Sequence, residues 1–121
     1  MKKEGFHEKL QRLIVEYIRL GSLVLNTFPK EEMYGMTSQC KRSLVSVFLN
    51  YTEAYARVQK GVMRNLYEVS YGSLQESIAT FYLAVQLHFI SKDEYTPLFQ
   101  RKEEIGKMLW KTIEGVKKDS R

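Results

Sequence analysis

The sequence predicts an all-α protein, an antiparallel up-down-up-down four-helix bundle that forms one domain over residues 1–121. Four amphipathic segments carry apolar residues at helical spacing, and no segment shows the period of two that a strand requires. Only short breaks separate these segments, and short connections make neighbouring helices antiparallel. With 121 residues, of which 44% are hydrophobic and 27% charged, the chain is long enough to bury a single core.

The first half of the chain contains two of the expected helices. The first is expected over Phe6–Asn26, with its apolar residues on one broad face. Pro29 is expected to break this helix, because a proline disfavours helical backbone at the residue before it. The proline can itself open a short helical turn. The second helix is expected to begin at Thr37 or Ser38, either of which can cap it, and to end near Gly61, which suits a left-handed position.

The second half contains the other two helices. The third is expected over Val62–His88, and we expect another helix to approach closely at Gly72, where a mid-helix glycine costs about 1 kcal/mol relative to alanine. Ser91 and Glu94 have the spacing of a capping box for the fourth helix. The apolar residues of that helix follow at steps of 7, 4, 4 and 3: Leu98, Ile105, Leu109, Ile113 and Val116.

A polar stripe runs along the second expected helix, while most of its other faces are apolar. Steps of 3, 4, 4, 3 and 4 residues place the members of the stripe on one face. We therefore expect this helix to be covered by its own bundle and by neighbouring subunits. The members are Gln39, Arg42, Ser46, Asn50, Glu53 and Arg57, the last two spaced for an i, i+4 ion pair.

A turn centred near residues 60–61 would place this stripe opposite the third helix, with Ser46 facing Glu76. We therefore predict a partly buried seam in which Arg42 neutralises Glu76, because a buried carboxylate needs a partner. Asn50 and Ser73 are expected to supply hydrogen bonds to this seam. Two interpretations stay open: the seam sets helix register and subunit packing, or it lines a surface for a ligand or nucleic acid.

The sequence predicts neither an enzyme nor a cofactor or metal site. The single metal-type E-x-x-H spacing, from Glu4 to His7, lies at the N-terminus, and no glycine-rich phosphate loop or nucleophile–base pair is present. Ribonuclease toxins of the bundle type use an arginine a few residues before a histidine. Neither His7 nor His88 has an arginine in the six positions before it. Cys40 is alone and is expected to be a small buried apolar residue. The absence of a spanning apolar run and of a signal-peptide core predicts a cytoplasmic protein.

Residues 28–43 and the positions that follow resemble a known bacterial family. The stretch 28–43 is similar to its signature FPxxExYGLxxQxRRA, positions 46–57 to SxxxNxAEGxxR, and positions 72–76 to GSLxE. That family comprises four-helix bundles encoded within intervening sequences of 23S ribosomal RNA genes. The resemblance implies a homo-oligomer, recurrently a pentameric ring, and kinship with accessory variability proteins of diversity-generating retroelements, which associate with a reverse transcriptase and with nucleic acid.

Two functions are compatible with these features. The balance of 19 basic and 14 acidic residues, +5 overall, suits an oligomeric accessory protein that contacts nucleic-acid phosphates without reading bases. The alternative is a purely structural or protein-interaction bundle whose charge gives solubility. The candidate phosphate contacts are Lys41, Lys60, Arg64, Lys117, Lys118 and Arg121.

Overall fold

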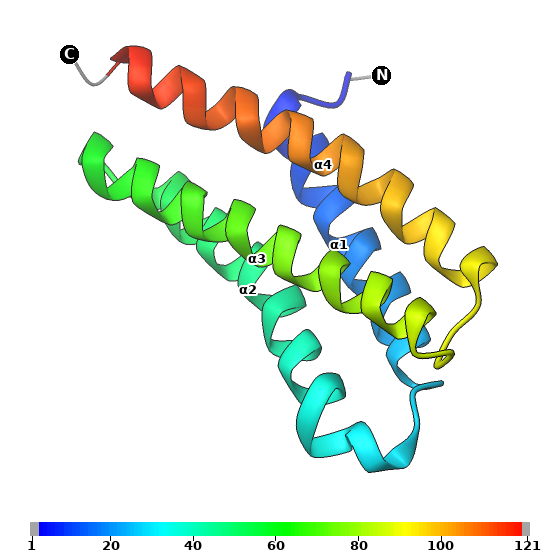
Figure 1. The fold of residues 1–121 in the computed structure, drawn as a ribbon. Helices are drawn as coiled ribbons and strands as arrows, with labels where there is room; N and C mark the ends of the chain where they lie inside the picture. The colour runs from blue at the N-terminus through cyan, green and yellow to red at the C-terminus, as the bar shows by residue number, and fades with distance from the viewer. Residues whose placement is uncertain (1–2, 120–121) are drawn as a thin grey trace.

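The computed structural model describes residues 3–119 of the chain. Over this range it holds no strand, and its four long helices are α1 (Phe6–Leu25), α2 (Ser38–Ala56), α3 (Lys60–Gln86) and α4 (Lys92–Asp119). Successive helices run in opposite directions (Figure 1). The prediction of an all-α four-helix bundle is therefore confirmed.

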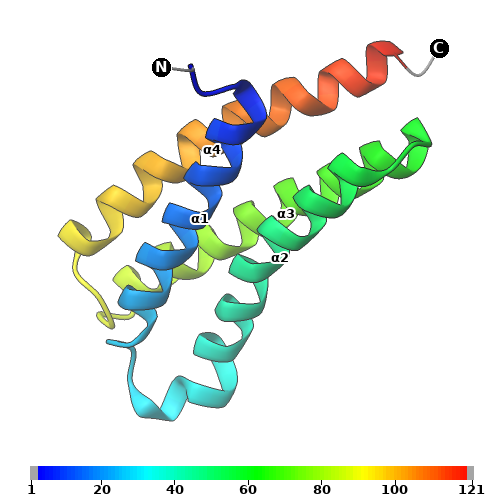
Figure 2. The ribbon, with the colours of Figure 1, turned by 180° about the vertical axis from the view of Figure 1, so that it is seen from behind.

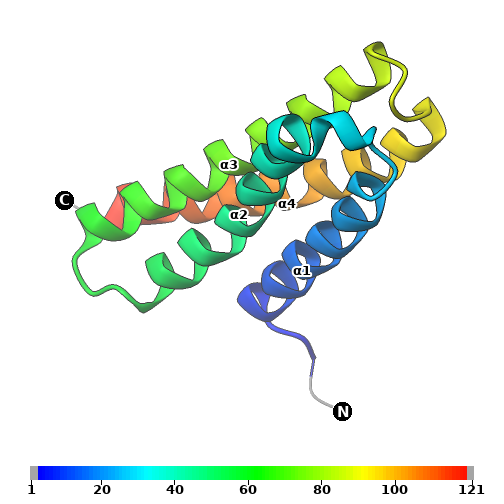
Figure 3. The ribbon, with the colours of Figure 1, turned by 90° about the horizontal axis from the view of Figure 1, so that it is seen from below.

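The helices form a closed cycle in which each packs on the next and α4 returns to α1. The contact between α2 and α3 is the most extensive, and these two helices run side by side as a long hairpin (Figure 2). The first helix has 20 residues against 27 in α3 and 28 in α4. One end of the α2–α3 hairpin and the C-terminal end of α4 therefore extend beyond α1 (Figure 3).

The core is built from the apolar stripe of each helix, which recurs at helical spacing and faces the bundle axis. The row predicted for α4, from Leu98 to Val116, is buried throughout. No helix of the described chain is both long and apolar enough to span a bilayer. Fully buried side chains come from all four helices: Leu10, Ile14, Tyr17, Leu44, Val47, Leu74, Phe81, Leu98, Ile105 and Leu109.

The close helix approach occurs at Gly21 and not at Gly72. A Cβ atom on Gly21 would lie 3.0 Å from Leu44 Cδ1 and 3.2 Å from Phe81 Cζ, so a larger residue there would have to displace these side chains where α1 meets α2 and α3. A Cβ atom on Gly72 would meet nothing within 4 Å. The close approach predicted at Gly72 is therefore wrong within the single chain, because this residue faces outward.

A short 3₁₀ turn (η1, Lys30–Glu32) and a π-helical turn (η2, Met33–Thr37) connect α1 to α2. Pro29 precedes the first of these turns, as expected from its fixed backbone angle. The second turn runs directly into α2 and contains one residue with non-helical angles, Gly35. The predicted start of α2 is confirmed, but the Thr37 side chain makes no capping hydrogen bond, because Thr37 is already helical.

The turn between α2 and α3 lies earlier than predicted. The helix α2 ends at Ala56, Arg57 takes an extended backbone (φ −83°, ψ 150°), and α3 begins at Lys60. Gly61 lies in the first turn of α3 and does not have positive φ, so its predicted C-terminal role is wrong. The earlier turn changes the register between the two helices, and Ser73 faces Ser46 in place of Glu76.

The connection from α3 to α4 is stabilised by caps on both sides. The N–H of His88 donates to the carbonyl of Val85 (3.1 Å), and the N–H of Phe89 donates to the carbonyl of Ala84 (2.8 Å). Together with the positive φ of His88 (62°), these two bonds form a Schellman motif. The capping box predicted for α4 is confirmed. Ser91 N donates to Glu94 Oε1 (2.9 Å), and Glu94 N donates to Ser91 Oγ (3.1 Å).

Replacing His88 by glycine is expected to raise the free energy of unfolding by about 0.5–1 kcal/mol. Glycine adopts the left-handed region without the steric cost that a Cβ imposes, and part of this gain is offset by its larger backbone entropy in the unfolded chain. Thermal unfolding followed by circular dichroism measures the change. Gln75→Gly, on an exposed position within α3, is the control and should lose a similar amount. A His88→Gly protein no more stable than its parent would contradict the prediction.

Candidate functional site

The polar seam between α2 and α3 consists of three half-buried side chains that bind one another. The hydroxyls of Ser46 and Ser73 lie 2.8 Å apart. Asn50 Nδ2 donates to Ser46 Oγ (2.8 Å) and to the Ser46 carbonyl (2.9 Å). The hydrogen bonds predicted for these residues are therefore present, and they link α2 to α3 across the outer edge of their contact.

The predicted ion pair between Arg42 and Glu76 is wrong. Both side chains are exposed, and they form no ion pair within the part of the chain that the structure describes. The physical reason is the shifted register. Ser77 and not Glu76 turns toward the bundle interior, where its hydroxyl is fully buried and its carbonyl lies 3.9 Å from Cys40 Sγ.

The remaining members of the stripe lie at the surface of the single chain. Gln39 and Glu53 are exposed, and Arg57 Nη2 pairs with Glu53 Oε2 at 2.5 Å as predicted. Apolar residues adjoin the polar seam on its outer side, with Val45 and Leu49 on α2. The same stretch of α2 lines a hollow of about 450 Å³, whose lining comprises Lys41, Arg42, Val45, Ser46, Leu49 and Asn50.

Cys40 is fully buried between α2 and α3, as predicted for a small apolar residue. Burial raises the pKa of its thiol to about 12, so the thiol stays protonated at neutral pH. Since the thiolate is the reactive form, Cys40 acts as a packing residue.

An aromatic cluster surrounds His7 at the end of the bundle where α1 begins. His7 Nδ1 lies 2.5 Å from the hydroxyl of Tyr51, and the His7 ring lies 4.6 Å from the ring of Tyr55. Burial lowers the pKa of His7, and it raises the pKa of Tyr67 to about 12. Tyr51 is buried with a bonded hydroxyl, whereas Tyr55 is partly exposed.

The E-x-x-H spacing does not create a metal site in the described chain. Glu4 forms a two-pronged ion pair with Arg12 (2.8 and 3.0 Å), while His7 bonds to Tyr51. Nowhere in the described chain do three or more histidine, cysteine, aspartate or glutamate residues gather as metal ligands.

The structure does not bring the predicted phosphate contacts together. Lys41 is exposed near the start of α2, whereas Lys60 begins α3 at the other end of the hairpin. Arg64 is half-buried and lies 3.9 Å from Glu68. Arg121 lies outside the described residues, as do the side chains of Lys117 and Lys118.

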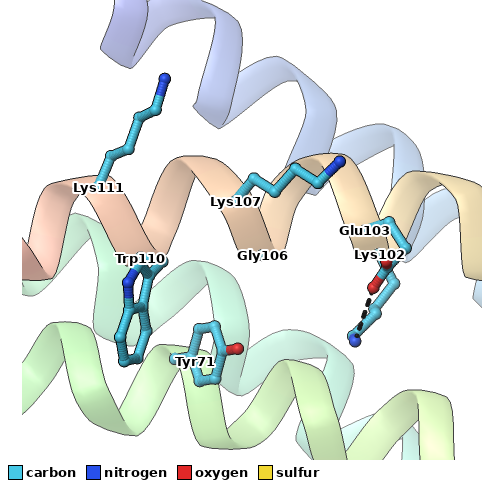
Figure 4. A pocket seen from close by; sticks show the side chains of 7 residues that line it. All are labelled: Tyr71, Lys102, Glu103, Gly106, Lys107, Trp110 and Lys111. Atoms are coloured by element: carbon cyan, nitrogen blue, oxygen red, sulfur yellow. Dashed lines mark hydrogen bonds and ion pairs between the residues drawn. The ribbon is translucent and has the colours of Figure 1, made fainter.

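A different group of cations lies along α4, and the sequence analysis missed it. Three lysines line a groove of about 380 Å³ between α3 and α4, together with Glu103, Gly106 and two aromatic residues. Figure 4 shows Tyr71 and Trp110 side by side between the two helices, with Lys107 and Lys111 extending from α4. The available signal was the i, i+4 spacing of the last two lysines around the single tryptophan. The groove lysines are Lys102, Lys107 and Lys111.

The comparisons with known proteins agree with this fold. The sequence profile described as 23S rRNA-intervening sequence protein matches residues 9–111, which include the polar seam and the groove on α4. The chain belongs to this family. Family membership agrees with the resemblance found in residues 28–76.

A solved structure has the same fold as this chain. It is a protein of unknown function from the S23 ribosomal protein family of Bacteroides thetaiotaomicron, with a TM-score of 0.72 and 20% sequence identity. The similarity covers 90% of this chain and 98% of the other. At this identity the likeness establishes the fold and no more. None of the curated proteins matches the sequence.

Proposed function

We propose that this member of the 23S rRNA-intervening sequence protein family is a non-enzymatic bundle that assembles with further copies of itself through the outer face of α2 and α3. The observation that carries this proposal is the presence of large exposed apolar side chains on both helices that share the polar seam. Leu49 is 56% exposed and Val69 is 50% exposed, on helices that share the seam formed by Ser46 and Ser73. Burying such exposed apolar side chains against another protein surface lowers the free energy, because it removes apolar area from water.

Two further features support a second copy as the occupant of this face. Gly72 carries no side chain and leaves the α3 backbone open beside Ser73, so another helix can approach it closely. Arg42 and Glu76 are exposed with opposite charges on the two sides of the face. Since identical copies carry both charges, the α2 side of one copy can meet the α3 side of the next, and such a head-to-tail contact can close into a ring. The family resemblance implies five copies.

We further propose that the assembly serves as a sequence-independent nucleic-acid-binding accessory, of the reverse-transcriptase-associated or rRNA-intervening-sequence type. The net charge of +5 supports this function, as do exposed cations such as Lys41 and Lys107, which make no ion pair with the residues that the structure describes. A ring repeats each weak phosphate contact, and repetition raises the overall affinity.

A purely structural or protein-interaction bundle is the second candidate. It is favoured by the many cations that are already paired with acids on the same surface. Arg12 contacts Glu4 and Glu16, and Lys9 lies 3.3 Å from Glu104. Paired cations attract phosphate weakly, because the neighbouring carboxylates cancel their field.

Size-exclusion chromatography with light scattering tests both proposals, with and without a mixed pool of single- and double-stranded nucleic acid at two salt concentrations. The accessory function predicts a multiple of the 14.3-kDa chain that retains nucleic acid at low salt and releases it at high salt. An assembly that ignores nucleic acid at both salt concentrations supports the interaction bundle. A single 14.3-kDa species throughout contradicts self-assembly.

A further inference from the structure

A hollow of about 360 Å³ opens at the end of the bundle where α1 begins and α4 ends. All four helices contribute to its walls: Phe6 and His7 come from α1, Tyr55 from α2 and Tyr67 from α3. Gly115 of α4 keeps it open, because a Cβ atom there would meet nothing within 4 Å. The volume is at the lower end of small-molecule sites and suits a ligand of about one or two rings.

Tyr67 brings a hydroxyl without a partner to this hollow. The residue is only 2% exposed, yet its hydroxyl forms no hydrogen bond with any residue that the structure describes. Within that range, the fully enclosed side-chain atoms that lack a partner are Thr37 Oγ1 and Arg64 Nε, so the Tyr67 oxygen is not enclosed and reaches the hollow that the residue lines. Burial raises the pKa of this phenol to about 12, so it keeps its proton and can donate at neutral pH. A buried donor without a partner points to a ligand that accepts from it.

The lining of the hollow carries one positive charge and no carboxylate. Lys111 lines it, and Figure 4 shows this side chain leaving α4 on the side away from Trp110. Lys111 is exposed and forms no ion pair with any residue that the structure describes. His7 adds no charge at neutral pH, because burial lowers the pKa of its imidazole. Met63 and Val116 add apolar surface to the walls.

We propose that this hollow binds a small aromatic carboxylate. The ring of the ligand lies against Phe6 and Tyr55, because aromatic rings pack edge-on or offset against one another. Its carboxylate accepts hydrogen bonds from the Lys111 ammonium and the Tyr67 hydroxyl, and the charges strengthen both bonds. This inference goes beyond the proposed function and does not depend on it.

Fluorine NMR of para-fluorobenzoate tests the proposal on the full-length protein at neutral pH. Binding broadens and shifts the fluorine signal of the ligand, and a titration gives a dissociation constant that we expect at about 0.1–1 mM. We expect the neutral para-fluorobenzamide to bind at least about ten-fold more weakly, because it lacks the charge. Cyclohexanecarboxylate, added as a competitor, lacks the aromatic ring and should also bind at least about ten-fold more weakly.

Three substitutions test the assigned groups. Gly115→Leu places a side chain in the hollow and is expected to abolish binding. Tyr67→Phe removes the hydroxyl and Lys111→Met removes the charge, and each should weaken binding of para-fluorobenzoate about ten-fold. Tyr67→Phe should keep the stability of the parent, since the lost hydroxyl has no partner among the described residues.

Each substitution has a matched control outside the hollow that should bind as the parent does. Gly61→Leu fills open space at another glycine, where a Cβ atom would also meet nothing within 4 Å. Tyr71→Phe removes the hydroxyl of the tyrosine one turn further along α3, and Lys107→Met removes the charge one turn earlier on α4. Circular dichroism verifies that all six proteins are folded.

No change of the fluorine signal up to about 10 mM ligand would overturn the proposal. Binding that survives Gly115→Leu would place the ligand elsewhere, with the same consequence. Equal affinity for the amide would reject the carboxylate, and equal affinity for cyclohexanecarboxylate would reject the aromatic ring, so either result overturns the assignment. The nucleic-acid proposal is tested separately by light scattering and stands or falls on that result alone.

Discussion

Replacing Leu49 by aspartate is expected to convert the proposed assembly into single folded chains. Leu49 is exposed in the chain by itself, so the substitution leaves the bundle core intact. In a self-association contact across α2 and α3 the same position is buried. An unpaired carboxylate there costs about 3–5 kcal/mol per contact, a loss in affinity of a hundred-fold or more.

Light scattering measures this change directly, as a fall to the 14.3-kDa mass of one chain. Thermal unfolding of Leu49→Asp verifies that the separated chain is still folded. The matched control is Leu23→Asp, which places the same charge at a leucine that is 61% exposed on α1, away from the seam. A Leu49→Asp protein that assembles as the parent does would show that this face is not the contact between copies.

Among substitutions of polar residues, Ser77→Ala is expected to lower the stability of the single chain most. The Tyr17 side chain is fully buried, and its hydroxyl lies 2.6 Å from Ser77 Oγ. Ser77 donates its own proton to the Leu74 carbonyl (2.7 Å), so Tyr17 is the donor to Ser77. Ser77→Ala leaves the buried phenol without an acceptor, which should lower the free energy of unfolding by about 1–3 kcal/mol.

A double-mutant cycle with Tyr17→Phe measures how much of this loss belongs to the pair. Tyr17→Phe removes the phenol and leaves no unsatisfied donor, so its cost should be smaller, about 0.5–1.5 kcal/mol. The doubly substituted protein should lose less than the sum of the two single changes, with a coupling of about 0.5 kcal/mol or more. Urea unfolding gives all four free energies. Strict additivity would contradict the hydrogen bond as the cause.

Much of the fold could be predicted because its signals are local. Helical spacing of apolar residues indicated α1 nearly to its ends and the buried row of α4 from Leu98 to Val116, and the capping box at Ser91 and Glu94 forms within a single turn. The Glu53–Arg57 pair is likewise confined to one helix. Each of these features depends on residues no more than four positions apart, so no tertiary contact is needed to create it.

The prediction failed where a local signal competed with packing. Gly61 suggested a helix end, yet α2 ends before it at Ala56, in a segment without glycine or proline. The buried row that includes Ser70 and Ser77 on α3 sets the register against α2 through bonds such as Ser70 Oγ to the Val47 carbonyl (2.6 Å). That register turns Glu76 outward, and Glu76 therefore does not form the ion pair predicted with Arg42.

The sequence by itself determined four amphipathic helices, their antiparallel order and the burial of Cys40, because helical periodicity and short connections allow few alternatives. Only the tertiary structure decided which surfaces remain open. The groove joins Tyr71 of α3 to Trp110 of α4, and the outer face carries Leu49 on α2 and Val69 on α3. Such surfaces depend on the register and rotation with which distant helices pack, and side-chain fit in the core sets both.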